Sequence, residues 1–274
     1  MRRVPQLRCR ACGHVVDAER LQYCELCFGP LDIVFDLRRA PVDRETIESG
    51  PRSIWRYGAL LPHDRGPHAG WTPLARAHTL GEVLGLDDLW LKDDTRNPTG
   101  SFKDRLVATA VARAHELGAR VLACASTGNL ARAVGVAARS RGMAAVVLIP
   151  AGMPVPGAIQ VAGGYDAVNR LSIEAAMRWE SWAWVNVGLR PFYVEGAATL
   201  AYETAEQLGW TAADHVLAPI ASGASLLRLH RAFGELAKAG LLDDTPTVRL
   251  SAAQPSGCAP VAAAFVAGAE DVRP

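Results

Sequence analysis

A lysine in a turn-rich loop is the first feature of this sequence that could carry chemistry. Lys103 stands in the stretch Asn-Pro-Thr-Gly-Ser-Phe-Lys-Asp-Arg, residues 97–105, at the expected start of a helix. The positive end of a helix and partial burial both disfavour an ammonium, so both lower the pKa of such a lysine. An amine with a lowered pKa suits nucleophilic or Schiff-base chemistry. The alternative is a solvated lysine that merely begins a helix.

Lysine is rare in this chain, which gives Lys103 more weight. Only Lys92, Lys103 and Lys238 occur among 29 basic residues, and all the others are arginine. A chain that favours arginine yet keeps a lysine in a loop shaped by glycine and proline is expected to need an amine there.

Two further loops lie where an expected strand runs into an expected helix. Residues 125–129 and residues 218–225 are both built from small and hydroxyl residues. Such loops can present backbone N–H groups at a helix N-terminus to a carboxylate or a phosphate. The first loop is equally well explained if Ser126, Thr127 or Asn129 caps the helix. The second loop lacks a Walker lysine and a G-x-G-x-x-G pattern, so a single phosphate is favoured over a nucleotide.

Four of the six cysteines form two Cys-x-x-Cys pairs separated by eleven residues. Two tight turns of this kind can present four thiolates tetrahedrally, so a structural Zn²⁺ is predicted on Cys9, Cys12, Cys24 and Cys27. A site closed by four protein ligands leaves no position for a substrate. The alternatives are two disulfides, which are rare in a reducing cytosol, or a remnant that holds no metal.

Alternating strands and helices must position these loops. Apolar runs predict the strands, and periodic runs that end near glycine predict the helices. The predicted strands are residues 89–92, 121–124, 144–149, 215–218 and 247–251, and the predicted helices are residues 104–117, 130–140 and 226–239. This order predicts an α/β fold with a parallel sheet covered on both faces. In such sheets, ligands bind at the carboxyl ends of the strands.

Composition excludes several classes of protein. The 274 residues suggest two domains with a small appendage, and 50% hydrophobic with 21% charged residues is ordinary globular composition. The net charge of +1 argues against a dedicated nucleic-acid-binding protein. Residues 1–8 lack the apolar stretch of a signal peptide, and prolines and glycines interrupt the uncharged run at 142–165. We therefore expect a cytoplasmic protein with no membrane segment and no nucleic-acid partner.

An amine, a carboxylate-binding loop and a phosphate-binding loop together suit pyridoxal 5'-phosphate. Residues 97–105 resemble the N-P-T-x-S-F-K-D-R signature of threonine synthases, which are fold-type II (tryptophan synthase β-like) pyridoxal-phosphate-dependent enzymes. Residues 123–129 are similar to the A-C-A-S-T-G-N loop of that family, and residues 218–225 to its A-P-I-A-S-G-S loop. The resemblance extends to the cysteine-rich start and to residues 165–171, 185–191 and 253–260. It implies two domains of three αβα layers that follow an N-terminal zinc ribbon.

The resemblance also implies roles for individual residues. Lys103 would hold the cofactor covalently and move protons at the substrate carbons, Phe102 would lie against the cofactor, and Asn129 would bond its ring hydroxyl. The cofactor phosphate would lie on the backbone of Ala221, Ser222, Gly223, Ala224 and Ser225. The substrate carboxylate would lie on Ser126, Thr127 and Gly128. The expected clamp for a substrate phosphate is Arg190, because a guanidinium matches a phosphate fork, with Arg96, Arg105 and Arg170 as alternatives.

The reaction that the resemblance implies is conversion of O-phosphohomoserine and water to threonine and phosphate, with the γ-phosphate eliminated before water adds at the β-carbon. Closure of a cleft between the two domains would keep water out early in the reaction. The resemblance is also compatible with a homodimer. The alternatives are another fold-type II activity, such as a serine/threonine dehydratase or a cysteate synthase-like β-replacement, a non-catalytic relative, and a nucleic-acid-binding ribbon.

The sequence departs from the family pattern in three places. The stretch 150–165 is shorter than in the family, so a helix and part of a strand are expected to be absent there. Ala198 stands where the E-G-x-K-T motif of the family has its lysine. The chain stops at Pro274, where the relatives continue, so a C-terminal truncation is expected. The expected domains are a zinc ribbon at residues 1–36, a larger cofactor-binding domain at 37–110 and 186–274, which is incomplete, and a smaller α/β domain at 111–185.

Overall fold

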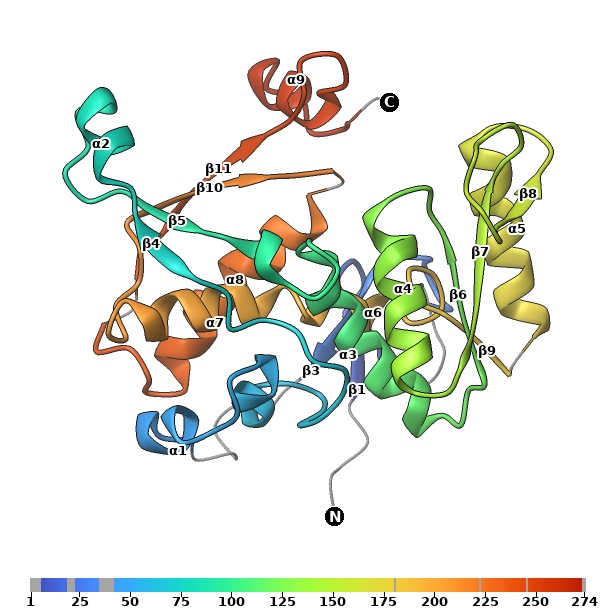
Figure 1. Cartoon of the computed structure of the whole chain (residues 1–274), viewed down its shortest axis with the longest axis horizontal. Helices are drawn as coiled ribbons and strands as arrows, with labels where there is room; N and C mark the ends of the chain where they lie inside the picture. The colour runs from blue at the N-terminus through green and yellow to red at the C-terminus, as the bar shows by residue number, and fades with distance from the viewer. Residues whose placement is uncertain are drawn as a thin grey trace.

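The computed structural model describes residues 6–18, 23–34, 42–179, 181–221, 223–244 and 246–272. The described residues form four sheets, with helices packed between and around them (Figure 1). No helix in these ranges is long and apolar enough to cross a bilayer.

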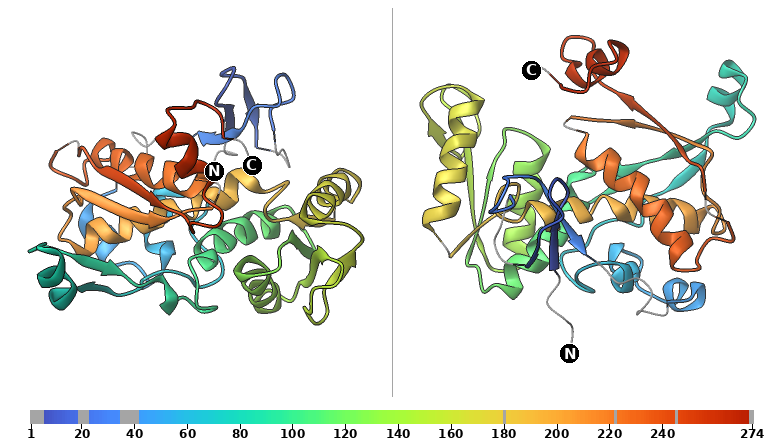
Figure 2. Two further views of the ribbon diagram at one scale, coloured as in Figure 1. Left: turned by 90° about the horizontal axis from the view of Figure 1, so that it is seen from above. Right: turned by 180° about the vertical axis from the view of Figure 1, so that it is seen from behind.

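The N-terminal sheet, which we call the ribbon, is antiparallel and has the strand order β2-β1-β3. Its strands are β1 (Gln6–Cys9), β2 (Val15–Asp17) and β3 (Leu31–Val34). The ribbon lies on the back of the molecule, and β3 contacts α6 (Arg190–Glu195) (Figure 2).

A four-stranded parallel sheet with the order β8-β7-β6-β9 forms the second unit. It consists of β6 (Val121–Ala125), β7 (Ala144–Pro150), β8 (Ile159–Val161) and β9 (Trp182–Trp184). Side chains of β6 alternate between the two faces, as a strand buried on both sides requires. Leu122 and Cys124 pack with α3 (Lys103–Glu116) and α4 (Asn129–Ser140), whereas Ala123 and Ala125 pack with α5 (Tyr165–Arg178).

The remaining elements include those that surround a second core. The strands β10 (His215–Pro219) and β11 (Arg249–Ala253) pair in parallel, and β4 (Leu74–Arg76) pairs antiparallel with β5 (Trp90–Lys92). The helical segments here are α1 (Arg44–Glu48), η2 (Ile54–Leu60), α2 (His78–Leu84), η3 (Asp94–Arg96), α7 (Ala198–Gln207), α8 (Ala224–Lys238) and α9 (Pro260–Val266). The apolar contact between α7, α8 and η2 fills this core.

Helix α3 lies between the two cores and contributes to both. Its Ala108 and Ala112 belong to the core around α7 and α8, whereas Val107 and Val111 belong to the core around β6 and α4. A helix buried on both sides in this way holds its first residue, Lys103, in a fixed place.

Most of the predicted elements are confirmed, and the differences have simple causes. The strands predicted at 121–124, 144–149 and 215–218 appear as β6, β7 and β10, and the strand predicted at 247–251 appears two residues later. No helix lies between β7 and β8, as expected from the short stretch there. The predicted covering of both sheet faces is found in the four-stranded sheet, around β6. Among the described residues, α8 covers one face of the β10–β11 pair, and Leu217 on the other face is 70% exposed.

We expect Leu122→Ala to destabilise the fold strongly. Leu122 is fully buried on β6, so the variant leaves a cavity, and the unfolding free energy should fall by about 2–5 kcal/mol in urea denaturation. The matched control is Leu84→Ala, which removes the same atoms from a side chain that is 57% exposed and should change stability by about 0.5 kcal/mol or less. Equal losses in the two variants would contradict the packing described here.

Candidate active site

Lys103 is the first residue of α3, and its side chain is half-buried. Its Nζ lies 5.2 Å from the centre of the Phe102 ring. Burial lowers the pKa of Lys103 from its ordinary value of 10.5, in the direction that a reactive amine needs. Within the described residues, its Nζ has no hydrogen-bond or ion-pair partner, so the amine is available to a ligand. Lys92, in contrast, uses its ammonium on Thr72 O, Glu203 and Gln207.

The polar residues of the loop at 97–102 bond the loop to itself and to its surroundings. Asn97 accepts a hydrogen bond from the backbone N of Gly70 at 2.8 Å and donates to the carbonyl of Asp94 at 3.0 Å. The Asp104 carboxylate accepts from the backbone N and the hydroxyl of Thr99, at 2.8 and 2.9 Å. These contacts fix the conformation of the loop that directly precedes Lys103.

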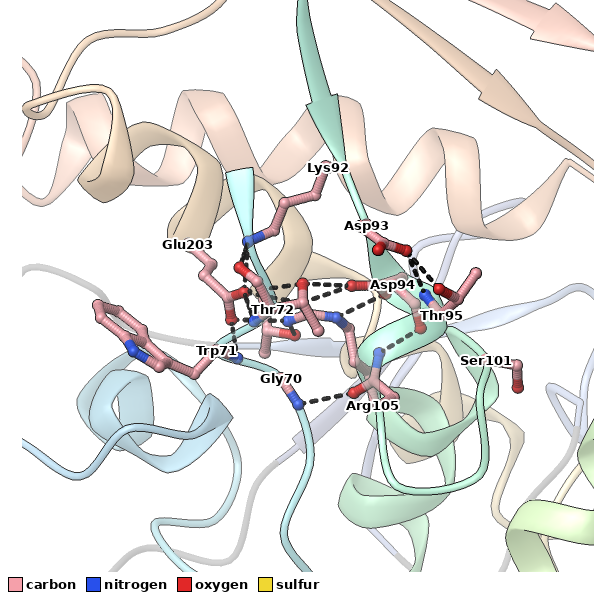
Figure 3. Close-up of polar contacts among 12 residues, drawn as sticks. Gly70, Trp71, Thr72, Lys92, Asp93, Asp94, Thr95, Ser101, Arg105 and Glu203 are labelled. Carbon is pink, nitrogen blue, oxygen red and sulfur yellow. Dashed lines mark hydrogen bonds and ion pairs between the residues drawn. The ribbon is translucent and has the colours of Figure 1, made fainter. Parts of the chain in front are cut away.

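Arg105 is fully buried and holds the start of α3 in place (Figure 3). Its guanidinium forms ion pairs with Asp94 at 2.8 Å and with Glu203 at 2.9 Å, and it donates to the hydroxyls of Thr72 and Thr199. The expectation that Arg105 could serve as a phosphate clamp is therefore wrong. Its N–H groups are consumed inside the protein, and no face of the side chain reaches solvent.

The loop at 126–128 connects β6 to α4. Ser126 is half-buried, whereas Thr127, Gly128 and Asn129 are exposed. Gly128 is the N-cap of α4, and no described side chain makes a capping hydrogen bond there. The Ser126 hydroxyl accepts from the backbone N of Gly128 at 3.3 Å instead. The first N–H groups of α4 are therefore left for a ligand, and the alternative that Ser126, Thr127 or Asn129 merely caps this helix is not what the structure shows.

The loop at 220–223 connects β10 to α8 in the same manner. Gly223 is the N-cap of α8, with a φ of 79° in the left-handed region that glycine adopts readily, and no described side chain caps the helix. Gln254 holds the preceding turn, because its amide donates to the carbonyl of Ala221 at 3.1 Å. Ala224 and Ser225 form the first turn of α8, and Ser222 lies outside the described residues.

Arg190 is the exposed first residue of α6, and no described residue pairs with its guanidinium. Arg96 is also exposed and lies 3.3 Å from Asp93, and Arg170 is an exposed residue of α5.

The three loops lie on the same side of the molecule. In Figure 1, the carboxyl ends of β6 and β10 lie on the side of α3 that carries its N-terminus. No hydrogen bond among the described residues links Lys103, Asn129 and the turn at 223–225.

These residues fit pyridoxal phosphate in two respects. A half-buried lysine amine has no polar partner among the described residues, which is what an aldehyde-bearing cofactor requires. Two helix N-termini that no described side chain caps offer backbone N–H groups, which suit a phosphate and a carboxylate.

The four cysteines of the ribbon meet at one point. Their Sγ atoms all lie within 4.8 Å of one another, and each cysteine is a free thiol. The Sγ atoms of Cys9 and Cys27 are 3.4 Å apart, and those of Cys12 and Cys24 are 3.6 Å apart. Four thiolates around Zn²⁺ at about 2.3 Å have similar mutual spacings. A Cβ on Gly29 would lie 2.8 Å from the Sγ of Cys9, so only glycine leaves this cluster intact.

The ribbon is joined to the rest of the chain by apolar and polar contacts. Phe192 of α6 is 1% exposed and belongs to the apolar core of the ribbon. Arg113 of α3 donates to the carbonyl of Ala18, and Asp32 of β3 pairs with Arg231 of α8 at 2.6 Å. Sequence reasoning missed Phe192, because nothing in the motif around Arg190 points to the ribbon.

Sequence reasoning also missed Lys92 and Glu203 as partners of the loop that carries Lys103. The scarcity of lysine was a usable signal for Lys92, because two of the three lysines, Lys92 and Lys103, are partly buried. For Glu203, the signal was a lone acid on the buried side of an otherwise apolar helix stretch, Ala-Tyr-Glu-Thr-Ala.

Comparison with known proteins gives consistent results. The sequence profile described as pyridoxal-phosphate dependent enzyme matches residues 66–274. The threonine synthase of Methanosarcina acetivorans is 30% identical over 283 residues, which cover 98% of this chain and 69% of the relative. The threonine synthase of Methanocaldococcus jannaschii is 32% identical over 285 residues, which cover 97% of this chain and 69% of the relative. The solved structure of maize serine racemase has a TM-score of 0.61 at 20% identity, and the match covers 85% of this chain and 68% of that chain.

The fold and these matches define the class: the chain belongs to the pyridoxal-phosphate dependent enzymes, with the α/β fold of fold type II. Within that class it is a member of the threonine synthase-like lyases. The predicted family and fold class are thereby confirmed.

We expect the unfolding free energy of Glu203→Gln to depend less on pH in the acid range than that of the wild type. Burial alone raises the pKa of Glu203, but Arg105 and Lys92 outweigh it and hold the pKa at about 2, below the ordinary 4.5. The charged carboxylate therefore stabilises the fold above pH 4.5, and this contribution, on the order of 3 kcal/mol, is lost as the pH falls from about 4.5 to about 2.

The measurement is urea denaturation of wild type and variant at several pH values. The difference in unfolding free energy should be large at pH 7 and shrink below pH 4.5. The exposed Glu174→Gln is the control and should follow wild type throughout. A constant difference between wild type and Glu203→Gln at all pH values would contradict the assigned pKa.

Proposed function

We propose that the protein is a threonine synthase, which converts O-phosphohomoserine and water to threonine and phosphate. The observation that carries the proposal is the amine of Lys103, which no described residue bonds or pairs with, in a chain that is 30–32% identical to threonine synthases over 97–98% of its length. The fold alone does not distinguish this reaction from others, because a serine ammonia-lyase from Rhizomucor miehei also has a TM-score of 0.57 at 21% identity.

When bound, pyridoxal phosphate supplies an aldehyde for the lysine amine and a ring that delocalises the negative charge that develops at the substrate carbons. In our proposal, Lys103 holds the cofactor and moves protons at those carbons, and Phe102 covers the cofactor. The amide of Asn129 bonds the ring hydroxyl. The lowered pKa of Lys103 supports this role, since an uncharged amine can accept a proton.

Anion-binding groups of the chain would hold the remaining parts of cofactor and substrate. We assign the cofactor phosphate to the backbone of Ala221, Ser222, Gly223, Ala224 and Ser225, and the substrate carboxylate to Ser126, Thr127 and Gly128. The starts of α8 and α4, which no described side chain caps, support this division. Arg190 is the proposed clamp for the substrate phosphate, because it is exposed and unpaired among the described residues.

We expect Lys103→Ala to abolish both cofactor attachment and turnover. The visible absorption of lysine-bound pyridoxal phosphate should disappear, and phosphate release from O-phosphohomoserine should fall at least about 100-fold. Lys238→Ala, which removes an exposed lysine at the end of α8, is the control and should keep both signals.

The same assay separates the competing reactions. Release of ammonia from serine or threonine without phosphate release from O-phosphohomoserine would favour a dehydratase, and consumption of phosphoserine with sulfite would favour a β-replacement. Cofactor absorption without turnover of any of these substrates would favour a non-catalytic relative, and an unchanged spectrum in Lys103→Ala would refute the assigned lysine.

We further propose that Cys9, Cys12, Cys24 and Cys27 bind one structural Zn²⁺. The close approach of the four thiolate sulfurs supports this, and free thiols are consistent with a cytoplasmic protein. If the protein shows no salt-dependent binding to nucleic acid, the alternative of a nucleic-acid-binding ribbon is excluded. We expect the main partner to be a small-molecule substrate, and we expect the protein to form a homodimer.

Elemental analysis should find one zinc per chain in the wild type. Cys12→Ser should lower the zinc content and the melting temperature, because the site gains a weaker ligand and the ribbon core loses its cross-link. Cys258→Ser, which changes an exposed cysteine outside the ribbon, should do neither. Wild-type protein without zinc, isolated in the absence of chelator, would refute the site.

A further inference from the structure

Arg105 makes two separate forks inside the protein. The first fork joins its Nε and Nη2 to the two carboxylate oxygens of Asp94, both at 2.8 Å. The second joins its Nη1 and Nη2 to the two carboxylate oxygens of Glu203, both at 2.9 Å. Only a planar guanidinium can satisfy two carboxylates at once in this way, because the ammonium of lysine is a point charge.

The two carboxylates come from different elements of the chain. Asp94 lies in η3, immediately before the loop that leads to Lys103, and Glu203 lies in the middle of α7. Glu203 also accepts from the backbone N atoms of Trp71 and Thr72, at 2.6 and 2.7 Å. Arg105 therefore links the segment at 70–72, the loop before α3 and helix α7 through a single side chain (Figure 3).

The surroundings leave the guanidinium no freedom. Gly70 has a φ of 75°, and a Cβ built there would lie 2.8 Å from Nη1 of Arg105 and 2.9 Å from a carboxylate oxygen of Glu203. The two cations, Arg105 and Lys92, are balanced by the two anions, Asp94 and Glu203, so the cluster carries no net charge. A balanced, fully bonded cluster of this kind fixes geometry even where its contribution to stability is small.

Helix geometry connects this cluster to Lys103. Two residues along an α-helix correspond to a rotation of about 200°, so Arg105 and Lys103 point to nearly opposite sides of α3. When the two forks fix the direction of Arg105, they also fix the rotation of the first helical turn, and with it the direction in which the amine of Lys103 points.

We propose that Arg105 is the positioning residue for Lys103. Its forks to Asp94 and Glu203 set the rotation of the first turn of α3, so that the amine is presented to the cofactor. This inference rests on the proposed function in one respect only, the assignment of Lys103 as the lysine that holds pyridoxal phosphate.

The chain offers a matched control at Arg56. This arginine is also buried, pairs with Glu206 of α7 at 2.7 Å, and stacks on Trp71 at 4.1 Å. Glu206 follows Glu203 by one turn of the same helix, but Arg56 lies in η2 and does not belong to α3. Arg56→Lys and Arg105→Lys therefore each replace one buried guanidinium next to α7, and only the second touches the helix of Lys103.

The first measurement needs no cofactor. Wild type and both variants are acetylated with acetic anhydride at a series of pH values, and mass spectrometry of the Lys103 peptide gives the titration and reactivity of that amine. We expect the apparent pKa of Lys103 to rise toward 10.5 in Arg105→Lys, as its restraint and burial are lost, and to stay at the wild-type value in Arg56→Lys.

The second measurement uses pyridoxal phosphate, with borohydride reduction to fix the adduct and peptide mapping to locate it. We expect half-maximal labelling of Lys103 in Arg105→Lys to require about tenfold more cofactor than in wild type, and labelling in Arg56→Lys to stay within about twofold. Circular dichroism at the assay temperature establishes that each variant is folded.

The outcomes are distinguishable. Equal behaviour of Arg105→Lys and Arg56→Lys in both measurements overturns the positioning role. If Arg105→Lys does not fold, Asp94→Asn, which keeps the shape of one fork and removes its charge, takes its place with the same expectations. A wild type that is labelled elsewhere than Lys103 overturns the proposed function, and the acetylation experiment still decides whether Arg105 governs that amine.

Discussion

The two forks of Arg105 are the interaction on which the site depends. A guanidinium buried in an apolar core is tolerated only if opposite charges and acceptors surround it completely. Asp94 provides one charge from 11 residues away in sequence, and Glu203 provides the other from 98 residues away. The segment at 70–72, the loop before α3 and helix α7 must therefore all be assembled before the charge of Arg105 is satisfied. The lysine loop is therefore a product of the tertiary structure, although its residues are consecutive in sequence.

The anion-binding groups near this loop are the N-termini of two helices. A capping side chain satisfies one of the first N–H groups of a helix and stabilises the helix by about 1 kcal/mol. Helices α4 and α8 begin at Gly128 and Gly223 without such a cap among the described residues. Both starts give up local stability and leave N–H groups that an anionic ligand can use, in the manner of many active sites.

Much of this arrangement could be predicted from the sequence, and the limits are physical. The long apolar runs of β6, β7 and β10 and the glycines behind α3 and α4 are strong local signals. The three-residue strands β4, β8 and β9 are too short to show a pattern, and tertiary pairing creates them. Contacts such as that of Arg105 with Glu203, 98 residues away, leave no local trace. The division into domains at residues 36, 110 and 185 stays a prediction.

The position of Phe192 has a consequence for biosynthesis. This side chain completes the apolar core of a ribbon whose other members, from Leu7 to Ile33, are made first. At a synthesis rate of about 5–20 residues per second, on the order of 10–30 s pass between the synthesis of Ile33 and that of Phe192. During that interval the inner apolar face of the ribbon is open to solvent and to other nascent chains, so the ribbon reaches its final packing only after most of the catalytic body has been translated.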